Sequence, residues 1–416
     1  MVGRADESHP LALAALAGPT LALYAPLGMA PLFTVVAVAA LILGRRHRPW
    51  RHVWRPGAAI LAAIIAWAAV SMVWTIEAPQ GLHTVLRLVA LAAGGLLLVA
   101  LAGRFDEPGQ RRVRSALAIG VTGALTMILI EVYVGGPGGM RFYANHPAYD
   151  LYTPRLGRGM TVCAVLLAPA AVAAWRNGFR LWPVAIVIMG GLAFIGGHTL
   201  SAKLSLLALP VVFLAAWRWR RSAGHGLSAA FAVVILAFPL LAWAPSPQQT
   251  SDDFAFLPNS AHHRLTIWVF SATRTMDHPL RGWGIEAARS IPGGEDKVEV
   301  RRPGNEVVDE QLMPLHPHNS PGQIWLELGG VGALLVCGLM LALGRVVATA
   351  PTRVDAAMMA ASMACAFIVA SVSYGVWQSW WLGTLWLTSA LCVAVSARRD
   401  PSADSRSAPE PQGSRP

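Results

Sequence analysis

Ionisable side chains gather at one edge of the long apolar segments of this sequence. His316-Pro317-His318-Asn319 ends the longest polar stretch, and Glu327 lies early in the apolar segment that follows. Three cations occupy comparable positions at or near the edges of apolar segments: Arg87, Lys203 and Arg264. Charged groups at such places are costly to bury and usually have a function or a partner. Several cations and an imidazole at one edge predict a site for an anionic substrate.

Each of these residues also has a purely structural interpretation. Arg87 and Lys203 would serve as helix anchors at a membrane interface, and Arg264 as a solvated loop charge. Glu327 would be a buried hydrogen-bond acceptor. The neighbouring pair His262-His263 is best interpreted as a surface feature. The His-Pro-His-Asn run is hardest to explain in this way, because proline fixes two imidazoles at a membrane edge.

The segments that must position these residues are apolar and long. Hydrophobic residues make up 55% of the 416-residue chain and charged residues only 13%, against about 25% charged in soluble domains. Apolar runs long enough for a membrane recur throughout, and the predicted spans are 11–26, 29–44, 57–75, 82–102, 114–134, 158–174, 181–197, 202–217, 227–244, 322–344, 354–373 and 379–396. The sequence therefore predicts an all-α integral membrane protein of about 12 transmembrane helices, with a large loop between helices 9 and 10.

Arginine clusters in alternate short loops predict the orientation of the chain. They place both termini in the cytoplasm and the long loop in the periplasm or at the cell exterior, as in a bacterial inner-membrane protein. The net charge of +11 is explained by these loops, so no nucleic-acid partner is expected. The predicted organisation is a cytoplasmic N-terminus (1–10), helices 1–9 (11–244), a periplasmic cap (245–321), helices 10–12 (322–396) and a disordered cytoplasmic tail (397–416).

The long loop has the composition of a small folded cap. Apolar spacing predicts a helix over 262–276, and the loop contains enough large apolar residues for a core: Trp268, Phe270, Leu280, Trp283 and Ile285. The four cysteines lie inside apolar runs without metal-ligand spacing. They predict neither a disulfide framework nor a metal site.

The segment 316–332 resembles the signature of the O-antigen ligase and polymerase superfamily, in which a His-Asn pair precedes a span that opens with Glu-x-Gly-x-x-Gly. Further similar elements are Arg264-Leu265-Thr266-Ile267-Trp268, Asp277-His278-Pro279-Leu280-Arg281-Gly282-Trp283-Gly284, Ser201-Ala202-Lys203 and Trp74-Thr75-Ile76-Glu77. Two positions depart from the family pattern. Lys203 stands in place of the usual arginine and loses bidentate geometry toward phosphate, and Gly322 stands where leucine is common, which would loosen the start of the tenth span.

The resemblance implies metal-independent glycosyl transfer without a cofactor, from an undecaprenyl-diphosphate-linked glycan donor embedded in membrane lipid. His318 would be the general base, and Asn319 would orient it or the acceptor. Arg264 and Lys203, with Arg87 as a weaker candidate, would bind the departing diphosphate. Supporting roles fall to four further residues, His316, Glu327, Trp268 and Arg281.

The acceptor distinguishes the members of this superfamily. A ligase transfers the glycan to lipid A-core, whereas a polymerase transfers it to a second lipid-linked glycan, and the placement of the long loop favours the ligase. A protein O-glycosylating enzyme is a third possibility. Outside the family, the hydropathy also allows a secondary transporter, although the two halves show no similarity. A zinc site at His316, His318 and 262–263, with Glu310, matches no known ligand spacing.

Overall fold

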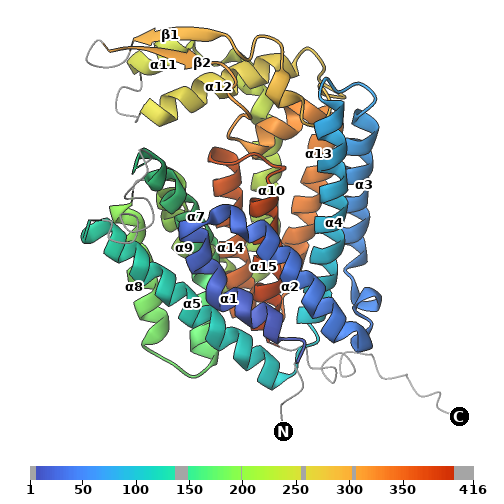
Figure 1. Ribbon diagram of the computed structural model, residues 1–416, viewed down its shortest axis with the longest axis vertical. Coiled ribbons are helices and arrows are strands. Elements are labelled where there is room, and N and C mark those ends of the chain that lie inside the picture. Colours follow the sequence, from blue (N-terminus) through green and yellow to red (C-terminus); the bar gives the residue numbers. More distant parts are fainter. Residues whose placement is uncertain (1–5, 136–148, 198, 254–258, 302–305, 398–416) are drawn as a thin grey trace, which may run out of the picture.

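The computed structural model describes residues 6–135, 149–197, 199–253, 259–301 and 306–397. It is a helical bundle with a small cap at one end (Figure 1). The bundle helices are α1 (His9–Tyr24), α2 (Met29–Gly44), α3 (Arg55–Ser71), α4 (Ala78–Ala102), α5 (Glu107–Tyr133), α7 (Tyr149–Arg176), α8 (Trp182–Gly196), α9 (Leu200–Arg218), α10 (Arg220–Ala237), α13 (Ser320–Ala348), α14 (Arg353–Val372) and α15 (Ser379–Val395). The predicted tail beyond Ala397 lies outside the described residues.

The helices match a membrane protein in length and composition. Within the described residues, eight helices are long and apolar enough to cross a bilayer, and α1, α3, α8 and α15 are shorter apolar helices. Each predicted apolar segment overlaps one of these helices, although α5, α7 and α10 begin at Glu107, Tyr149 and Arg220 rather than at residues 114, 158 and 227. The helical membrane class is confirmed, whereas the count of twelve crossings and their orientation stay predictions.

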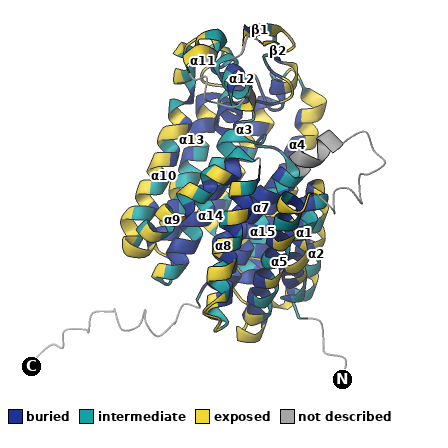
Figure 2. Cartoon of the chain, turned by 90° about the vertical axis from the view of Figure 1, so that its left-hand side faces the viewer, coloured by how far each residue is buried: buried dark blue, intermediate teal, exposed yellow. Residues whose placement is uncertain are grey.

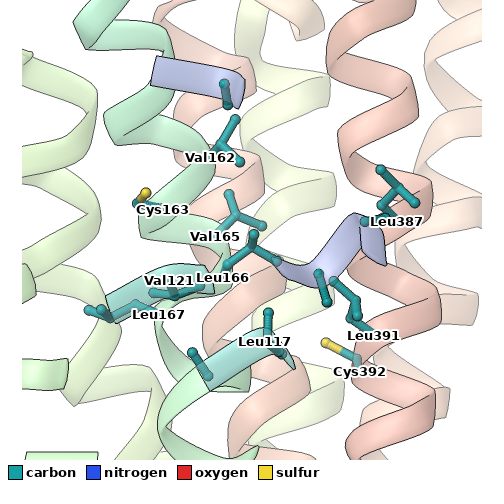
Figure 3. Packing of buried hydrophobic residues seen from close by; sticks show 14 of the residues in the cluster. Leu117, Val121, Val162, Cys163, Val165, Leu166, Leu167, Leu387, Leu391 and Cys392 are labelled. Carbon is teal, nitrogen blue, oxygen red and sulfur yellow. The ribbon is translucent and has the colours of Figure 1, made fainter. Parts of the chain in front are cut away.

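Helix α7 forms the centre of the bundle. In the segment Leu156–Arg176 of α7, 83% of the residues in an 18-residue apolar stretch are buried, against 33% in α13. Figure 2 shows α7 largely in the colour of buried residues. Figure 3 shows Val165 and Leu166 of α7 among buried side chains of α5 and α15, such as Leu117 and Leu391. Because lipid supplies no hydrophobic driving force between helices, this close packing is what holds them together.

Small residues allow the backbones to approach. A Cβ atom added to Gly120 of α5 would lie 2.3 Å from the carbonyl oxygen of Ala15 in α1. One added to Gly159 of α7 would lie 2.6 Å from the Cα atom of Leu23. Close approach at such positions increases the van der Waals contact between helices.

The cap is built from residues between α10 and α13. After the 3₁₀ helix η4 (Phe238–Trp243), it contains α11 (Pro247–Asp253), α12 (Asn259–Thr275), the 3₁₀ helix η5 (Ala287–Ser290) and the antiparallel strands β1 (Lys297–Arg301) and β2 (Val307–Gln311). Helix α12 confirms the helix predicted over 262–276. The strands were not predicted, because each buries a single side chain, Val300 in β1 and Glu310 in β2, and so shows no apolar alternation.

The core of the cap differs from the prediction at two positions. Trp268, Phe270 and Trp283 pack around buried Ile267 and Leu326 as one apolar cluster. Leu280 is instead 75% exposed, because its turn docks through the backbone. His262, expected at the surface, is only 2% exposed.

The turn 279–284 docks on α13 where this helix is interrupted. Gly329 has φ 64° and ψ −164° inside α13, which frees backbone groups for outside partners. The N–H of Trp283 donates to the carbonyl of Leu326, and that of Gly330 to the carbonyl of Pro279. Gly282, also at positive φ, would place a Cβ atom 2.4 Å from the carbonyl oxygen of Glu327. The turn around Gly282 and the interruption of α13 at Gly329 therefore contact each other through their backbones.

The close contact at Gly329 predicts that a methyl group added there lowers the stability of the protein. In Gly329→Ala, the Cβ atom would lie 2.4 Å from the carbonyl oxygen of Leu280 and hold an L-residue at positive φ. We expect the free energy of unfolding to fall by about 2–5 kcal/mol, measured as the thermal transition of the purified protein in detergent. Gly338→Ala is the matched control, because no atom of the described structure lies within 4 Å of that Cβ position. Equal transitions for the two variants would contradict the prediction.

Candidate functional site

The His-Pro-His-Asn loop is held from two sides at the base of the cap. The indole N–H of Trp268 in α12 donates to the carbonyl of Pro317 at 2.9 Å. On the other side, Oδ1 of Asn319 accepts the N–H of Gly322 at 2.8 Å and caps α13. Between these anchors His318 adopts a left-handed backbone with φ 52°. A non-glycine residue at positive φ is uncommon and directs attention to a functional role.

The carbonyl of Ser373 determines which nitrogen of His318 carries the proton. Nδ1 of His318 lies 2.9 Å from that carbonyl oxygen, which can only accept a hydrogen bond, so Nδ1 carries hydrogen. In the neutral ring Nε2 is then the proton-accepting nitrogen. Burial lowers the pKa of His318, and the charge of Arg264 lowers it further, against the opposing effect of the Ser373 carbonyl. The imidazole is therefore neutral at pH 7 with an available lone pair.

His316 is also neutral but lacks an available nitrogen. Burial, followed by the charges of His318, Arg289 and Arg158, lowers its pKa to about 3. The backbone N–H of His318 donates to its Nδ1 at 3.1 Å, so in the neutral ring Nε2 carries the hydrogen, and Nε2 lies 3.0 Å from the side-chain nitrogen of Gln378. Its ring centroid lies 4.3 Å from that of His318. His316 thus supports the reactive imidazole and does not itself accept a substrate proton.

Arg264 brings a positive charge to this imidazole. Arg264 lies on α12 one turn before Trp268. The hydrogen bond from Trp268 to the loop therefore also fixes the backbone position of Arg264 relative to His318. Burial lowers the pKa of Arg264, while Tyr374 raises it, and a guanidinium stays protonated in proteins. Within the described part of the chain, no hydrogen bond or salt bridge engages its side chain. Its donors are available to an anion.

A pocket of about 330 Å³ lies on the other side of His316. Its lining comes from the 3₁₀ helix η1 (Pro26–Gly28), α2, α4, α7, η5, α13 and the α14–α15 loop, and it includes Leu27, Ala30, Arg87, Arg158, Glu286, Arg289, His316, Gln323, Trp377 and Trp380. Three guanidinium groups face one carboxylate. The pocket is positively charged, with an apolar side, as an amphipathic anion requires.

Glu286 fixes two of the three arginines. Its carboxylate accepts from Nε of Arg289 at 2.7 Å and from the hydroxyl of Thr84 at 2.6 Å, and it lies 3.7 Å from Arg87. Arg158 forms no salt bridge within the described residues, and its charge acts on His316, His318 and Tyr374. Arg158 is thus a pocket cation whose charge is not neutralised by a carboxylate of the described residues.

Glu327 lies beneath the pocket and is completely buried. Its carboxylate accepts from the side chain of Gln323 at 2.9 Å, the indole of Trp377 at 2.6 Å and the backbone N–H of Glu286 at 2.7 Å. All of its visible partners are protein donors. The structural interpretation of this residue, as a buried acceptor, therefore fits its geometry.

The structure brings together only some of the residues expected from the sequence. Arg87 and His316 line the pocket, and Arg264 acts on His318. Lys203 is exposed on the first turn of α9 and does not line the pocket. Arg281 is also exposed and lies over the ring of Trp74 at 5.7 Å, where it supports the docked turn rather than the pocket.

Gly322 has a different effect from the one expected. A Cβ atom there would lie 2.4 Å from the ring of Phe238, so the glycine admits this buried aromatic side chain of η4 against the start of α13. The first turn is further held by the Asn319 cap. The glycine therefore tightens the contact between α13 and η4 instead of loosening the helix.

Two pocket cations were absent from the sequence-based prediction. Arg158 is the first residue of the predicted span 158–174, so the rule that selected other ionisable residues at span edges would also have found it. Arg289 lies in an irregular part of the cap, and no sequence pattern marks it. Its position depends on Glu286, whose left-handed backbone with φ 63° is a product of the tertiary fold.

Comparisons with known proteins relate this chain to one family. Residues 184–337 match the sequence model of the family described as O-antigen ligase, a region that contains Arg264, His318 and Glu327. The chain is 25% identical over 337 residues to a protein of Rickettsia conorii named "putative polysaccharide ligase", which covers 79% of this chain and 78% of that one. A relative from Rickettsia typhi with the same name is 26% identical over 80% of this chain and 79% of its own.

A third relative of that name, from Rickettsia bellii, is 30% identical over 38% of each chain. The match to the family model includes the loop before α13, the interrupted start of α13 and the turn that docks on it. The family match and the names of these relatives support the O-antigen ligase superfamily as the family of this chain.

Proposed function

We propose that this protein transfers a glycan from a polyprenyl-diphosphate carrier to lipid A-core at the periplasmic face of the inner membrane. The observation that carries the proposal is the bond from Nδ1 of His318 to the Ser373 carbonyl, beside a pocket lined by three arginines. This arrangement combines a proton acceptor with a binding site for a diphosphate. The family and the names of the relatives support a ligase-type function.

The reaction forms one bond and breaks another at the anomeric carbon of the donor. Nε2 of His318 takes the proton of the acceptor hydroxyl as its oxygen attacks that carbon, a role worth about 10²–10⁴-fold in rate. The bond from the anomeric carbon to the diphosphate oxygen breaks, and the lipid diphosphate departs with an additional negative charge. Arg264, Arg158 and Arg87 stabilise that charge by position, and the proton leaves His318 for the diphosphate or for water.

The remaining residues of the site position these groups. Trp268 and Asn319 fix the loop that carries the base, and His316 fills the space between the base and the pocket. The apolar side of the pocket, with Leu27, Ala30 and Trp380, suits the first isoprene units of an undecaprenyl chain. No residue of this scheme requires a metal ion.

A polymerase would use the same donor chemistry with a second lipid-linked glycan as acceptor. The names of the relatives refer to ligases. Because the two activities share the donor, they differ only in which acceptor the site binds. A deletion strain separates them. A ligase mutant accumulates polymerised glycan on its lipid carrier, whereas a polymerase mutant leaves lipid A-core with a single repeat unit.

His318→Ala should abolish complementation of such a strain. We expect transfer to fall by about 10²–10⁴-fold, seen on a gel as loss of long glycan on lipid A-core. His225→Ala is the matched control, because His225 is exposed near the start of α10, whereas the cap follows the other end of this helix. Wild-type glycan in the His318→Ala strain would exclude His318 as the base.

The lowered pKa of His318 sets the pH dependence. Its ordinary pKa is 6.5 and burial moves it lower, so the proton-accepting form prevails above the lowered value and is lost as pH falls through it. We expect kcat/KM of the purified enzyme to be flat between about pH 6.5 and 8 and to decline only below that range. Removing a nearby positive charge in Arg264→Gln should move the decline to higher pH. A decline centred above 6.5 in the wild type would contradict this assignment.

Arg158 and Lys203 provide a comparison between pocket and surface charge. Arg158→Gln should lower kcat by on the order of 100-fold, because it removes unpaired charge facing the leaving diphosphate. Lys203→Gln removes an equal charge outside the pocket and should lower kcat by less than about threefold. Both rates are measured with lipid-linked glycan and lipid A-core in detergent. An equal loss of kcat in the two variants would contradict this prediction and would indicate that Lys203 also binds the diphosphate.

A further inference from the structure

A second pocket lies at the end of the bundle opposite the cap, where α9 ends and α10 and α14 begin (Figure 1). It has a volume of about 290 Å³ and is lined by Arg218, Trp219, Arg220, Arg221, Ser222 and Arg353. Four of the six lining residues are arginines and none is acidic. The pocket is separate from the site at the base of the cap and shares no residue with it.

In the described part of the chain, no acidic side chain balances the positive charge of this pocket. Within the described residues, none of its arginines forms a salt bridge. The carboxylate of Asp355, two residues after Arg353, is already paired with Arg176 at 2.7 Å. It also accepts hydrogen bonds from the backbone N–H and the hydroxyl of Thr352, the N-cap residue of α14. Four guanidinium groups around one concave surface therefore lack a counter-charge among the residues that the structure describes. A phosphate group matches the forked donors of arginine better than any other common anion.

The pocket is held by contacts that leave its charges exposed. Nη1 of Arg220 donates to the carbonyl of Ala350 at 2.9 Å, which joins α10 to the start of α14. A Cβ atom added to Gly224 would lie 2.6 Å from the carbonyl oxygen of Gly344, so α10 also lies directly against α13. These contacts fix the position of the pocket before any ligand arrives, which lowers the entropic cost of binding.

An apolar surface leads from the pocket along α9. Leu207, Val211 and Leu214 are 70%, 66% and 61% exposed, and their spacing places them with Arg218 on one face of the helix. Figure 2 shows exposed residues in yellow along α9 and α10. Trp219, 59% exposed beside the guanidinium of Arg218, has the amphipathic character of residues at a membrane interface. Acyl chains would fit this face while a headgroup occupies the pocket.

We propose that this pocket binds the phosphate of an anionic membrane phospholipid, with its acyl chains along α9. The four arginines, none of which has an acidic partner among the described residues, supply the recognition of the headgroup. The exposed apolar face distinguishes a lipid from a free phosphate ion. Basic pockets between transmembrane helices recognise anionic headgroups by this combination of charge and apolar contact. The site does not depend on the function proposed for the cap side of the protein.

The test compares lipid binding by the full-length protein in neutral detergent. The probes are dioleoyl phosphatidylglycerol, dioleoyl phosphatidylcholine and inorganic phosphate at equal ionic strength, and the measurements are the thermal transition and lipid retention in native mass spectrometry. We expect phosphatidylglycerol alone to raise the transition of the wild type. In R218Q/R221Q/R353Q its apparent Kd should rise by on the order of 100-fold, since each basic residue contributes about fivefold.

R45Q/R46Q/R51Q is the matched control, because it removes three exposed arginines from the same end of the bundle but outside the pocket. This control should bind phosphatidylglycerol as the wild type does. An equal loss in both triple variants would mean general charge attraction and would overturn the proposal. A response to inorganic phosphate as large as that to the lipid would overturn the assignment to a phospholipid, as would binding of phosphatidylcholine with equal affinity.

Discussion

The site depends on the backbone contact between the turn 279–284 and the interrupted start of α13. Two glycines at positive φ, Gly282 and Gly329, allow main chains to meet with no side chain between them. The carboxylate of Glu327 then accepts hydrogen bonds from Gln323, Trp377 and the backbone of Glu286. One buried carboxylate thereby joins α13, the α14–α15 loop and the cap. Two pocket arginines, Arg289 and Arg87, are positioned through this junction, because Glu286 in turn pairs with both.

Opposing electrostatic effects meet at His318. Burial and the charge of Arg264 lower its pKa, so the imidazole is neutral and ready to accept a proton, although it is a weaker base than in water. The same arginine attracts the anionic donor. When a diphosphate arrives, its negative charge offsets the nearby guanidinium groups, and we expect the proton affinity of His318 to rise as the donor binds. The cations that bind the donor and the base that activates the acceptor are in this way coupled through charge.

The sequence by itself determined the class of the protein and the position of its reactive loop. Apolar segments can pair their backbone polar groups only as helices in lipid, so length and composition predicted the helical bundle. The run 316–319 at the edge of a span identified the loop because a buried or interfacial imidazole and cation are rarely without a role. The resemblance to the O-antigen ligase superfamily rested on the glycine and histidine motifs that also form the junction, and the family match agrees with it.

Only the tertiary structure decided which charges meet. Hydropathy locates each residue along a span but contains no information on how the spans are arranged around α7. The sequence-based prediction therefore selected Lys203 and omitted Arg158, although both stand at the start of a predicted span. The fold places Arg158 in the pocket and leaves Lys203 outside it. Likewise, the tautomer of His318 depends on a carbonyl at Ser373, 55 residues later in the chain. Such contacts arise from packing between distant segments, and local sequence therefore determined the reactive groups, whereas the fold determined their partners.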